Sequence, residues 1–219
     1  MKIFDCITYF NEPLLFKLRL NILDKFVDKF IVVESLFTHS GKKKKINFDK
    51  SIYPLFKDRI EHIVLEEEPK NIIYPDQLNK RMNSVKRIQF QRDYIKKIFS
   101  KNNEYDWLIY SDSDEIPNLE NINWEKNEKN IIFFKQKLFY YKFNLTLPNQ
   151  DWYGSRACKL KNLESISFLR NSKPKKYDWW RLDTIYRKDK HRNVKIVENG
   201  GWHFSDLKTA KEILEKKTK

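Results

Sequence analysis

The 219-residue sequence has few cysteines and glycines and no long apolar run. Its two cysteines, Cys6 and Cys158, are too few for a disulfide framework, which favours a reducing, cytoplasmic setting. Four glycines and seven prolines exclude a collagen-like or linker-rich chain. The apolar runs, such as 30–33 and 131–134, are far shorter than the roughly twenty residues of a membrane-spanning helix. We therefore expect no transmembrane segment.

Basic residues outnumber acidic ones, with 44 Lys+Arg against 30 Asp+Glu and a net charge of +14. This excess suits attraction to phosphates, anionic glycans or a membrane surface, and peripheral membrane contact stays open. A coding bias toward Lys, Asn and Ile explains the charge equally well. The run from Lys42 to Lys45 favours a solvated loop over an anion site. Because the charges are dispersed and no recognition motif appears, we expect no nucleic-acid partner. The sequence does not predict an oligomeric state.

The first half alternates short apolar runs with helical periodicity. We predict helices from Pro13 onward and over 83–100, and strands over 3–8, 30–33, 60–65 and 107–110. This alternation predicts an α/β domain with a mostly parallel sheet and helices on both faces. In such sheets ligands bind at the carboxyl ends of the strands.

The second half predicts a smaller antiparallel extension that completes a pocket. It begins with a long aromatic strand over 131–145 and ends with a helix over 209–217, and shorter strands are expected near 152–160, 182–187, 195–197 and 202–205. Trp179 and Trp180 are adjacent, so one of them is expected to be exposed, where it could pack on a sugar ring. We expect both halves to form a single domain over 1–219.

The sharpest motif is Ser111-Asp-Ser-Asp-Glu115, which follows a buried strand. In extended backbone, Asp112 and Asp114 would point the same way and could bind Mg²⁺ or Mn²⁺ through carboxylate oxygens. The alternative is a solvated turn that caps the next helix.

A second motif lies on the helix predicted over 83–100. Val85, Ile88, Ile95 and Phe99 predict its buried face, and Arg92 falls in the same phase. A buried arginine needs a partner, here a phosphate or a carboxylate such as Asp112, unless it extends to solvent. Asp93 could accept a hydrogen bond from a ribose hydroxyl or face solvent.

A third motif is Gly200-Gly-Trp-His-Phe-Ser205, which holds two of the four glycines. Paired glycines in a glycine-poor chain predict close backbone approach or an unusual φ. His203 could ligate Mn²⁺ or donate to a phosphate, or it could be a core histidine bonded to backbone.

Together these stretches resemble glycosyltransferase family 17, the family of the bisecting β-1,4-N-acetylglucosaminyltransferase. The matching stretches run in family order: Phe4–Glu12, Leu18–Asn21, Phe30–Ser35, Gln91–Asp93, Ser111–Pro117, Phe139–Asn144 and Gly201–Ser205.

The resemblance implies a GT-A-like (Rossmann-like) fold and inverting transfer of N-acetylglucosamine from UDP-N-acetylglucosamine to a glycan or polysaccharide, with Mn²⁺ or Mg²⁺. Residues 1–117 would then form the nucleotide-sugar-binding half and 118–219 the acceptor half. By the family pattern, Asp114 would bind the metal and Asp112 would contact the ribose or the metal's water shell; Asp112 and His203 remain candidate metal ligands from the motifs themselves. The nucleotide would be bound by Thr8, Asn11, Glu34, Arg92, Asp93 and Asp112.

A carboxylate must accept the acceptor's proton. The candidates are Asp206, Asp183 and Glu115, and Asp206 is favoured because it closely follows His203. Two other classes stay open: a metal-dependent phosphoesterase, which needs clustered Asp and His, and a basic nucleic-acid-binding protein.

Overall fold

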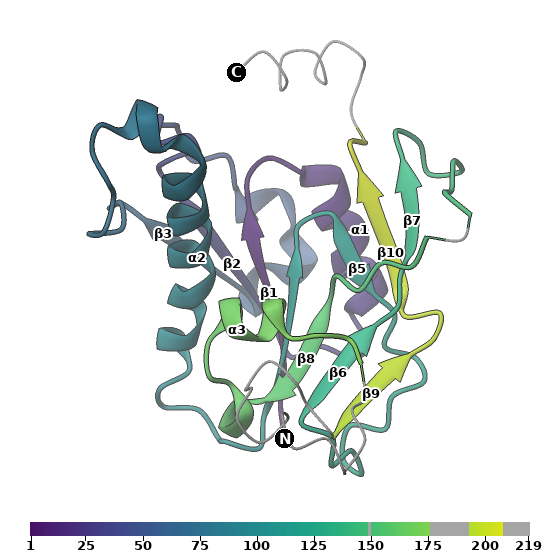
Figure 1. Ribbon diagram of the computed structural model, residues 1–219. Helices are drawn as coiled ribbons and strands as arrows, with labels where there is room; N and C mark the ends of the chain where they lie inside the picture. Colours follow the sequence, from purple (N-terminus) through teal and green to yellow (C-terminus); the bar gives the residue numbers. More distant parts are fainter. Residues whose placement is uncertain (149, 176–192, 208–219) are drawn as a thin grey trace.

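A central sheet organises the computed structural model, which describes residues 1–148, 150–175 and 193–207 (Figure 1). Its seven strands have the order β3-β2-β1-β4-β8-β6-β9. The first four in sequence are parallel, as the alternation predicts: β1 (Ile3–Tyr9), β2 (Lys29–Ser35), β3 (Ile60–Leu65) and β4 (Trp107–Asp112). Helix α1 (Pro13–Leu23) connects β1 to β2, and α2 (Lys80–Ile98) lies between β3 and β4.

The second half extends the same sheet and adds a small one. Strand β8 (Arg156–Lys159) is antiparallel to β4 and to β6 (Ile131–Phe134), and β9 (Val194–Val197) is parallel to β6. In the small sheet, β10 (Gly201–Ser205) is antiparallel to β5 (Glu115–Pro117) and parallel to β7 (Lys137–Tyr140).

The long strand predicted over 131–145 is wrong, because the chain changes sheets after β6. Lys135 N–H donates to Val197 and Gln136 N–H to Trp152, which directs β7 into the small sheet. The expected strand over 182–187, the terminal helix, Trp179 and Trp180 lie outside the described residues.

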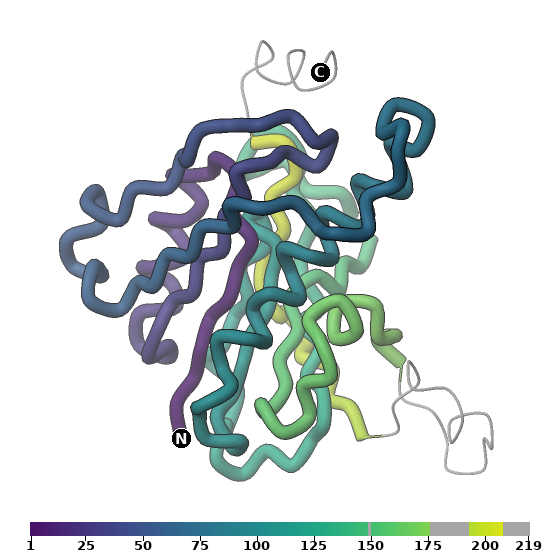
Figure 2. The backbone as a smooth tube through the Cα atoms, turned by 90° about the vertical axis from the view of Figure 1, so that its left-hand side faces the viewer, coloured from purple at the N-terminus to yellow at the C-terminus, as the bar shows by residue number. Residues whose placement is uncertain are grey.

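Two apolar cores cover the two faces of the main sheet. On β2, Phe30 and Val32 face the core that α1 closes, while Ile31 and Val33 face the core closed by α2 and by α3 (Ile166–Asn171). In Figure 1, α2 and α3 lie in front of the sheet and α1 behind it. The tube in Figure 2 separates these layers from the side. The alternation of side chains along each strand places helices on both faces.

The buried face of helix α2 is apolar at its C-terminal end, where Ile95 and the following Phe99 are buried as predicted, but polar over its first half. Its buried residues are Asn83, Arg87, Gln91 and Ile95, whereas Val85 is 46% exposed, so its predicted burial is wrong. The reason is that the first half of α2 covers loops rather than the sheet. Asn83 bonds both backbone groups of Ile73, and Arg87 pairs with Glu68 and Asp76. These contacts fix the loop that precedes α2 at the carboxyl edge of the sheet. Among the described residues, four short 3₁₀ segments complete the connections: η1 (Lys50–Ile52), η2 (Pro54–Arg59), η3 (Asp76–Asn79) and η4 (Leu160–Asn162).

A buried ion pair ties α1 to the small sheet. Arg19 and Asp5 are 0% and 1% exposed, and the guanidinium donates to both carboxylate oxygens at 2.6 and 2.5 Å. The same guanidinium donates to the Glu115 carbonyl. Arg19 therefore holds the backbone that follows the Asp-x-Asp motif.

The paired glycines allow close backbone approach, as predicted: Gly201 lies against β5, and Gly200 lies against the ends of β6 and β9. Gly201 has φ +121°, and a Cβ there would overlap the Ile116 carbonyl. A Cβ at Gly200 would lie 2.7 Å from the Lys135 nitrogen. Both cysteines, Cys6 and Cys158, are free and buried. Among the described helices, none has the length and apolarity needed to cross a membrane.

Candidate active site

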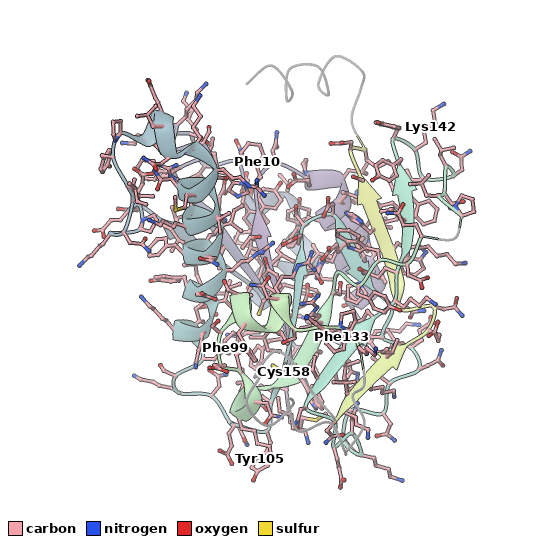
Figure 3. The ribbon with its side chains drawn as sticks, viewed as in Figure 1. Phe10, Phe99, Tyr105, Phe133, Lys142 and Cys158 are labelled. Carbon is pink, nitrogen blue, oxygen red and sulfur yellow. The ribbon has the colours of Figure 1, made fainter. Side chains whose placement is uncertain are left out.

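The site lies at the carboxyl end of β4, where the chain turns into β5. Asp112 ends β4, Asp114 lies in the turn and Glu115 begins β5. The i, i+2 spacing predicted that the carboxylates of Asp112 and Asp114 point the same way. The turn interrupts the extended backbone between them, and the two carboxylates contact different residues. Figure 3 shows the same end of the molecule with Phe10, just beyond β1, and Lys142, just beyond β7.

Two arginines and a tyrosine hold Asp112. Arg92 of α2 donates to its oxygens at 2.9 and 3.1 Å, and Arg170 of α3 donates at 2.9 Å. The Tyr110 hydroxyl donates at 2.9 Å. Arg92 thus has the carboxylate partner named for it from the sequence. Asp112 forms ion pairs with both arginines and accepts their hydrogen bonds. Its contact with a nucleotide or a metal stays a prediction.

Glu115 is the most enclosed acid of the site, with a side chain 1% exposed. Arg170 binds it with both arms of its guanidinium, at 2.9 and 2.6 Å. The Trp152 indole N–H donates to it at 2.8 Å and the Asp112 backbone N–H at 3.0 Å. This enclosure makes it less accessible than Asp206, the other proposed base within the described part of the chain.

Asp114, Glu115 and His203 form the group that could hold a metal ion. One ligand atom of each lies within 4.8 Å of the others. His203 Nε2 lies 3.4 Å from Asp114, and its ring stacks on Trp152 with centroids 4.5 Å apart. The buried Nδ1 has no hydrogen-bond partner among the described residues. Two carboxylates and an imidazole suit Mn²⁺ or Mg²⁺, so these residues fit the ion that the family resemblance implies. Asp112 is not part of this group.

The charges of the site favour its ionised forms. Burial alone would raise the pKa of Asp112, but Arg170, Arg92 and the Tyr110 hydrogen bond lower it below the ordinary value. Burial opposes the charge of Arg170, yet Glu115 and Asp112 raise the pKa of its guanidinium. The same balance with Tyr110 and Asp112 raises the pKa of Arg92. Arg92, Arg170 and the Asp112 carboxylate therefore stay charged together.

The residues expected at the nucleotide end lie on the same edge but differ in access. Thr8 Oγ1 lies 3.2 Å from the Tyr110 hydroxyl, so it joins the hydrogen bonds that lead to Asp112. Asn11 is exposed just beyond β1. Glu34 is fully buried and binds Lys44 and the backbone N–H groups of 47 and 48. Glu34 thereby holds the 36–48 loop, and its contact with a nucleotide stays a prediction.

Asp93 anchors α3 to α2. Its carboxylate accepts the Ser167 backbone N–H at 2.7 Å, in the first turn of the helix that carries Arg170. Adjacent residues of α2 thus serve one site, because Arg92 reaches Asp112 directly and Asp93 fixes the helix of Arg170. Its predicted ribose contact is not tested.

The remaining base candidates differ in position. Asp206 directly follows β10, with φ +51°, and is half-buried. Asp183 lies outside the described residues.

Sequence reasoning missed Arg170 and the part played by Trp152. Arg170 lies on a six-residue helix that no periodicity predicted. Trp152 lies at the start of the strand expected near 152–160, and its contacts with Glu115 and His203 depend on pairing between distant segments.

Comparison with known structures gives weak likenesses. Crystal structures of HddC from Yersinia pseudotuberculosis and of A197 from STIV are 10% and 14% identical, with TM-scores of 0.44 and 0.34. The first match covers 91% of this chain and 92% of the other, and the second covers 91% and 83%. The inositol-1-phosphate CTP transferase from T. maritima is 12% identical, with 98% and 94% covered and a TM-score of 0.40. No curated protein matches the chain.

A family model gives the assignment. The model for glycosyltransferase family 17 matches residues 1–216, nearly the whole chain, and so includes both the β4 edge and the β10 histidine. The protein therefore belongs to glycosyltransferase family 17 and is a glycosyltransferase.

Proposed function

We propose that the protein transfers a sugar, N-acetylglucosamine, from UDP-N-acetylglucosamine to a glycan or polysaccharide with inversion at C1, and that it depends on Mn²⁺ or Mg²⁺. The observation that carries the metal dependence is the meeting of Asp114, Glu115 and His203 at the carboxyl end of β4, beside Arg92 and Arg170. Family membership supports a nucleotide-sugar donor. The identity of the donor sugar rests on the resemblance noted in the sequence.

Inverting transfer forms a bond from the acceptor hydroxyl oxygen to C1 and breaks the bond from C1 to the diphosphate oxygen. A bound divalent ion would stabilise the negative charge that develops on the leaving diphosphate. Asp114, Glu115 and His203 would hold that ion. Arg92 and Arg170 carry fixed charges suited to phosphate oxygens, because a guanidinium presents paired donors.

The acceptor's proton passes to a carboxylate, for which we propose Asp206. It lies on the strand end that also carries His203, within three residues of the proposed metal ligand. The acceptor hydroxyl passes its proton to this carboxylate as the new bond to C1 forms.

Calorimetric titration of UDP tests the site without an acceptor. We expect a Kd in the micromolar range, about −8 kcal/mol, with Mn²⁺ and none in its absence. Asp114→Ala should lose this binding. Asp24→Ala is the matched control, because Asp24 is an acid that pairs with Arg59 at the end of α1. Absence of UDP binding to the wild type under both conditions would refute the proposal. Hydrolysis of p-nitrophenyl phosphate without an acceptor would then favour a phosphoesterase.

A further inference from the structure

Arg170 is paired with a carboxylate that the proposed metal ion would also need as a ligand. Its guanidinium forks onto both oxygens of Glu115 at 2.9 and 2.6 Å and also donates to Asp112 at 2.9 Å. Glu115 is in turn one of the three residues of the candidate metal group. A single carboxylate is thus shared between a fixed cation of the protein and the position of a divalent cation.

The charges of the site are nearly balanced without a ligand. Asp112, Asp114 and Glu115 bring three negative charges, and Arg92 and Arg170 bring two positive ones. Arg156, whose charge interacts with Glu115 and Asp112, brings a third. A divalent ion that enters alone meets the charge of Arg170 across Glu115. A diphosphate that enters alone meets the three carboxylates. Either ligand is repelled when it binds alone. When the cation and the diphosphate bind together, their opposite charges attract each other and offset that repulsion.

Of the two arginines, Arg170 is the one placed to respond to both ligands. Arg92 contacts Asp112 and Tyr110, so it does not touch a member of the metal group. Arg170 contacts Glu115 as well as Asp112. Its helix is held independently of its side chain, because Asp93 accepts the Ser167 N–H and Arg156 donates to the Leu169 carbonyl. The guanidinium can therefore change partners while α3 stays in place.

We propose that Arg170 is an exchangeable counter-cation that couples metal binding to diphosphate binding. In the free protein it neutralises Glu115 and Asp112. When the metal takes Glu115, the Arg170 fork passes to an oxygen pair of the donor's diphosphate. A planar fork matches carboxylate and phosphate, so the two hydrogen bonds to Glu115 would be replaced by two to the diphosphate. This inference rests on the proposed function for the identity of the second ligand.

The test measures two affinities by calorimetry, Mn²⁺ alone and UDP in saturating Mn²⁺. Arg170→Gln should bind Mn²⁺ alone about tenfold more tightly and UDP about tenfold more weakly, within the usual size of coupling between two sites. Arg170→Lys keeps the charge but loses the fork. It should bind Mn²⁺ within about twofold of the wild type, because the repulsion is retained. Its UDP affinity should fall about threefold, because a point charge replaces the paired donors.

Arg87→Gln is the matched control. Arg87 is also a buried arginine paired with two acids, Glu68 and Asp76, but it lies on α2 away from the metal group. We expect it to change thermal stability and to leave both affinities as in the wild type. In Arg170→Gln we expect Mn²⁺ affinity to rise and UDP affinity to fall. If Arg170 only supported the fold, its loss would weaken the binding of both ligands.

Several results would overturn the proposal. If Arg170→Gln binds Mn²⁺ no more tightly than the wild type, Arg170 does not compete with the metal for Glu115. If its UDP affinity is unchanged, Arg170 does not move to the diphosphate. If a thermal melt shows that Arg170→Gln does not fold, the Arg170→Lys variant provides the test. An unchanged UDP affinity in Arg170→Lys would count against the exchange. If the wild type binds Mn²⁺ but not UDP, the proposed function fails. The Mn²⁺ affinities of the variants still report whether Arg170 competes for Glu115.

Discussion

Replacing Arg19 with methionine should destabilise the fold strongly and also weaken the metal site. The side chain is fully buried, and its loss leaves the Asp5 carboxylate, 1% exposed, without its charged partner. Removal of one member of a buried ion pair typically costs about 3–5 kcal/mol. A domain of this kind has about 5–15 kcal/mol of total stability, so the variant should still fold at low temperature.

The double variant Asp5→Leu with Arg19→Met isolates the second task of Arg19. An apolar pair of similar volume can replace a buried ion pair at little cost, so most of the loss should be recovered. The Glu115 carbonyl would still lack its donor, which leaves a deficit of about 1–3 kcal/mol. That deficit falls on the backbone between Asp114 and β5. We therefore expect the double variant to fold but to bind Mn²⁺ more weakly.

Urea denaturation of the wild type, both single variants and the double variant gives the coupling energy. We expect at least about 2 kcal/mol, as for residues in direct contact. Lys29→Met is the control, because Lys29 and Glu61 are 49% and 44% exposed at 3.8 Å and should contribute about 0–1 kcal/mol. An Arg19→Met cost as small as this control would refute the reasoning. A double variant with wild-type Mn²⁺ affinity would refute the proposed effect of Arg19 on the metal site.

Three further predictions concern the site itself. Asp206→Asn should abolish sugar transfer and leave UDP affinity within about twofold, measured by UDP release and titration; retained turnover would dismiss Asp206 as the base. Gly154→Ala should weaken Mn²⁺ binding about 10- to 100-fold in calorimetry, because its Cβ would overlap the Glu115 carboxyl, and equal affinity would contradict this. The folded pKa of Asp112 lies below its unfolded value of about 3.9, so its ionised form stabilises the protein above that pH and the contribution disappears as the pH falls through the folded value. Asp112→Asn should therefore flatten the fall in unfolding free energy between pH 6 and pH 3, and an acid limb as steep as in the wild type would count against it.

The sequence predicted the parallel half of the fold because its signals are local. Strands β1 to β4 are short apolar runs, and Pro13 begins α1 as its fixed φ favours. The glycine pair before His203 correctly indicated close backbone approach, since Gly201 adopts a conformation that other residues rarely take. The Asp-x-Asp motif indicated the edge where the site lies.

The parts that escaped prediction depend on contacts between distant segments. Helix α2 shows polar burial at Asn83 and Arg87 because loops cover it, which hydrophobic periodicity does not detect. The run over 131–145 reads as one strand because both halves are apolar, although β6 and β7 pair in different sheets. Arg170 has no local pattern at all, and its importance appears only when α3 packs beside β4.

The position of β10 also determines when the enzyme becomes competent during its own synthesis. His203 reaches Glu115 through a strand pairing that spans nearly ninety positions of sequence, and chains emerge at about 5–20 residues per second. A nascent chain that has emerged through residue 200 can already pair β1 with β2 and β4, yet Asp114 and Glu115 still lack their imidazole partner. Closing so long a loop carries an entropic cost that local pairings do not. Partly made chains can therefore be folded over much of the sheet while the candidate metal group of Asp114, Glu115 and His203 is still incomplete, so that group is assembled only when β10 pairs.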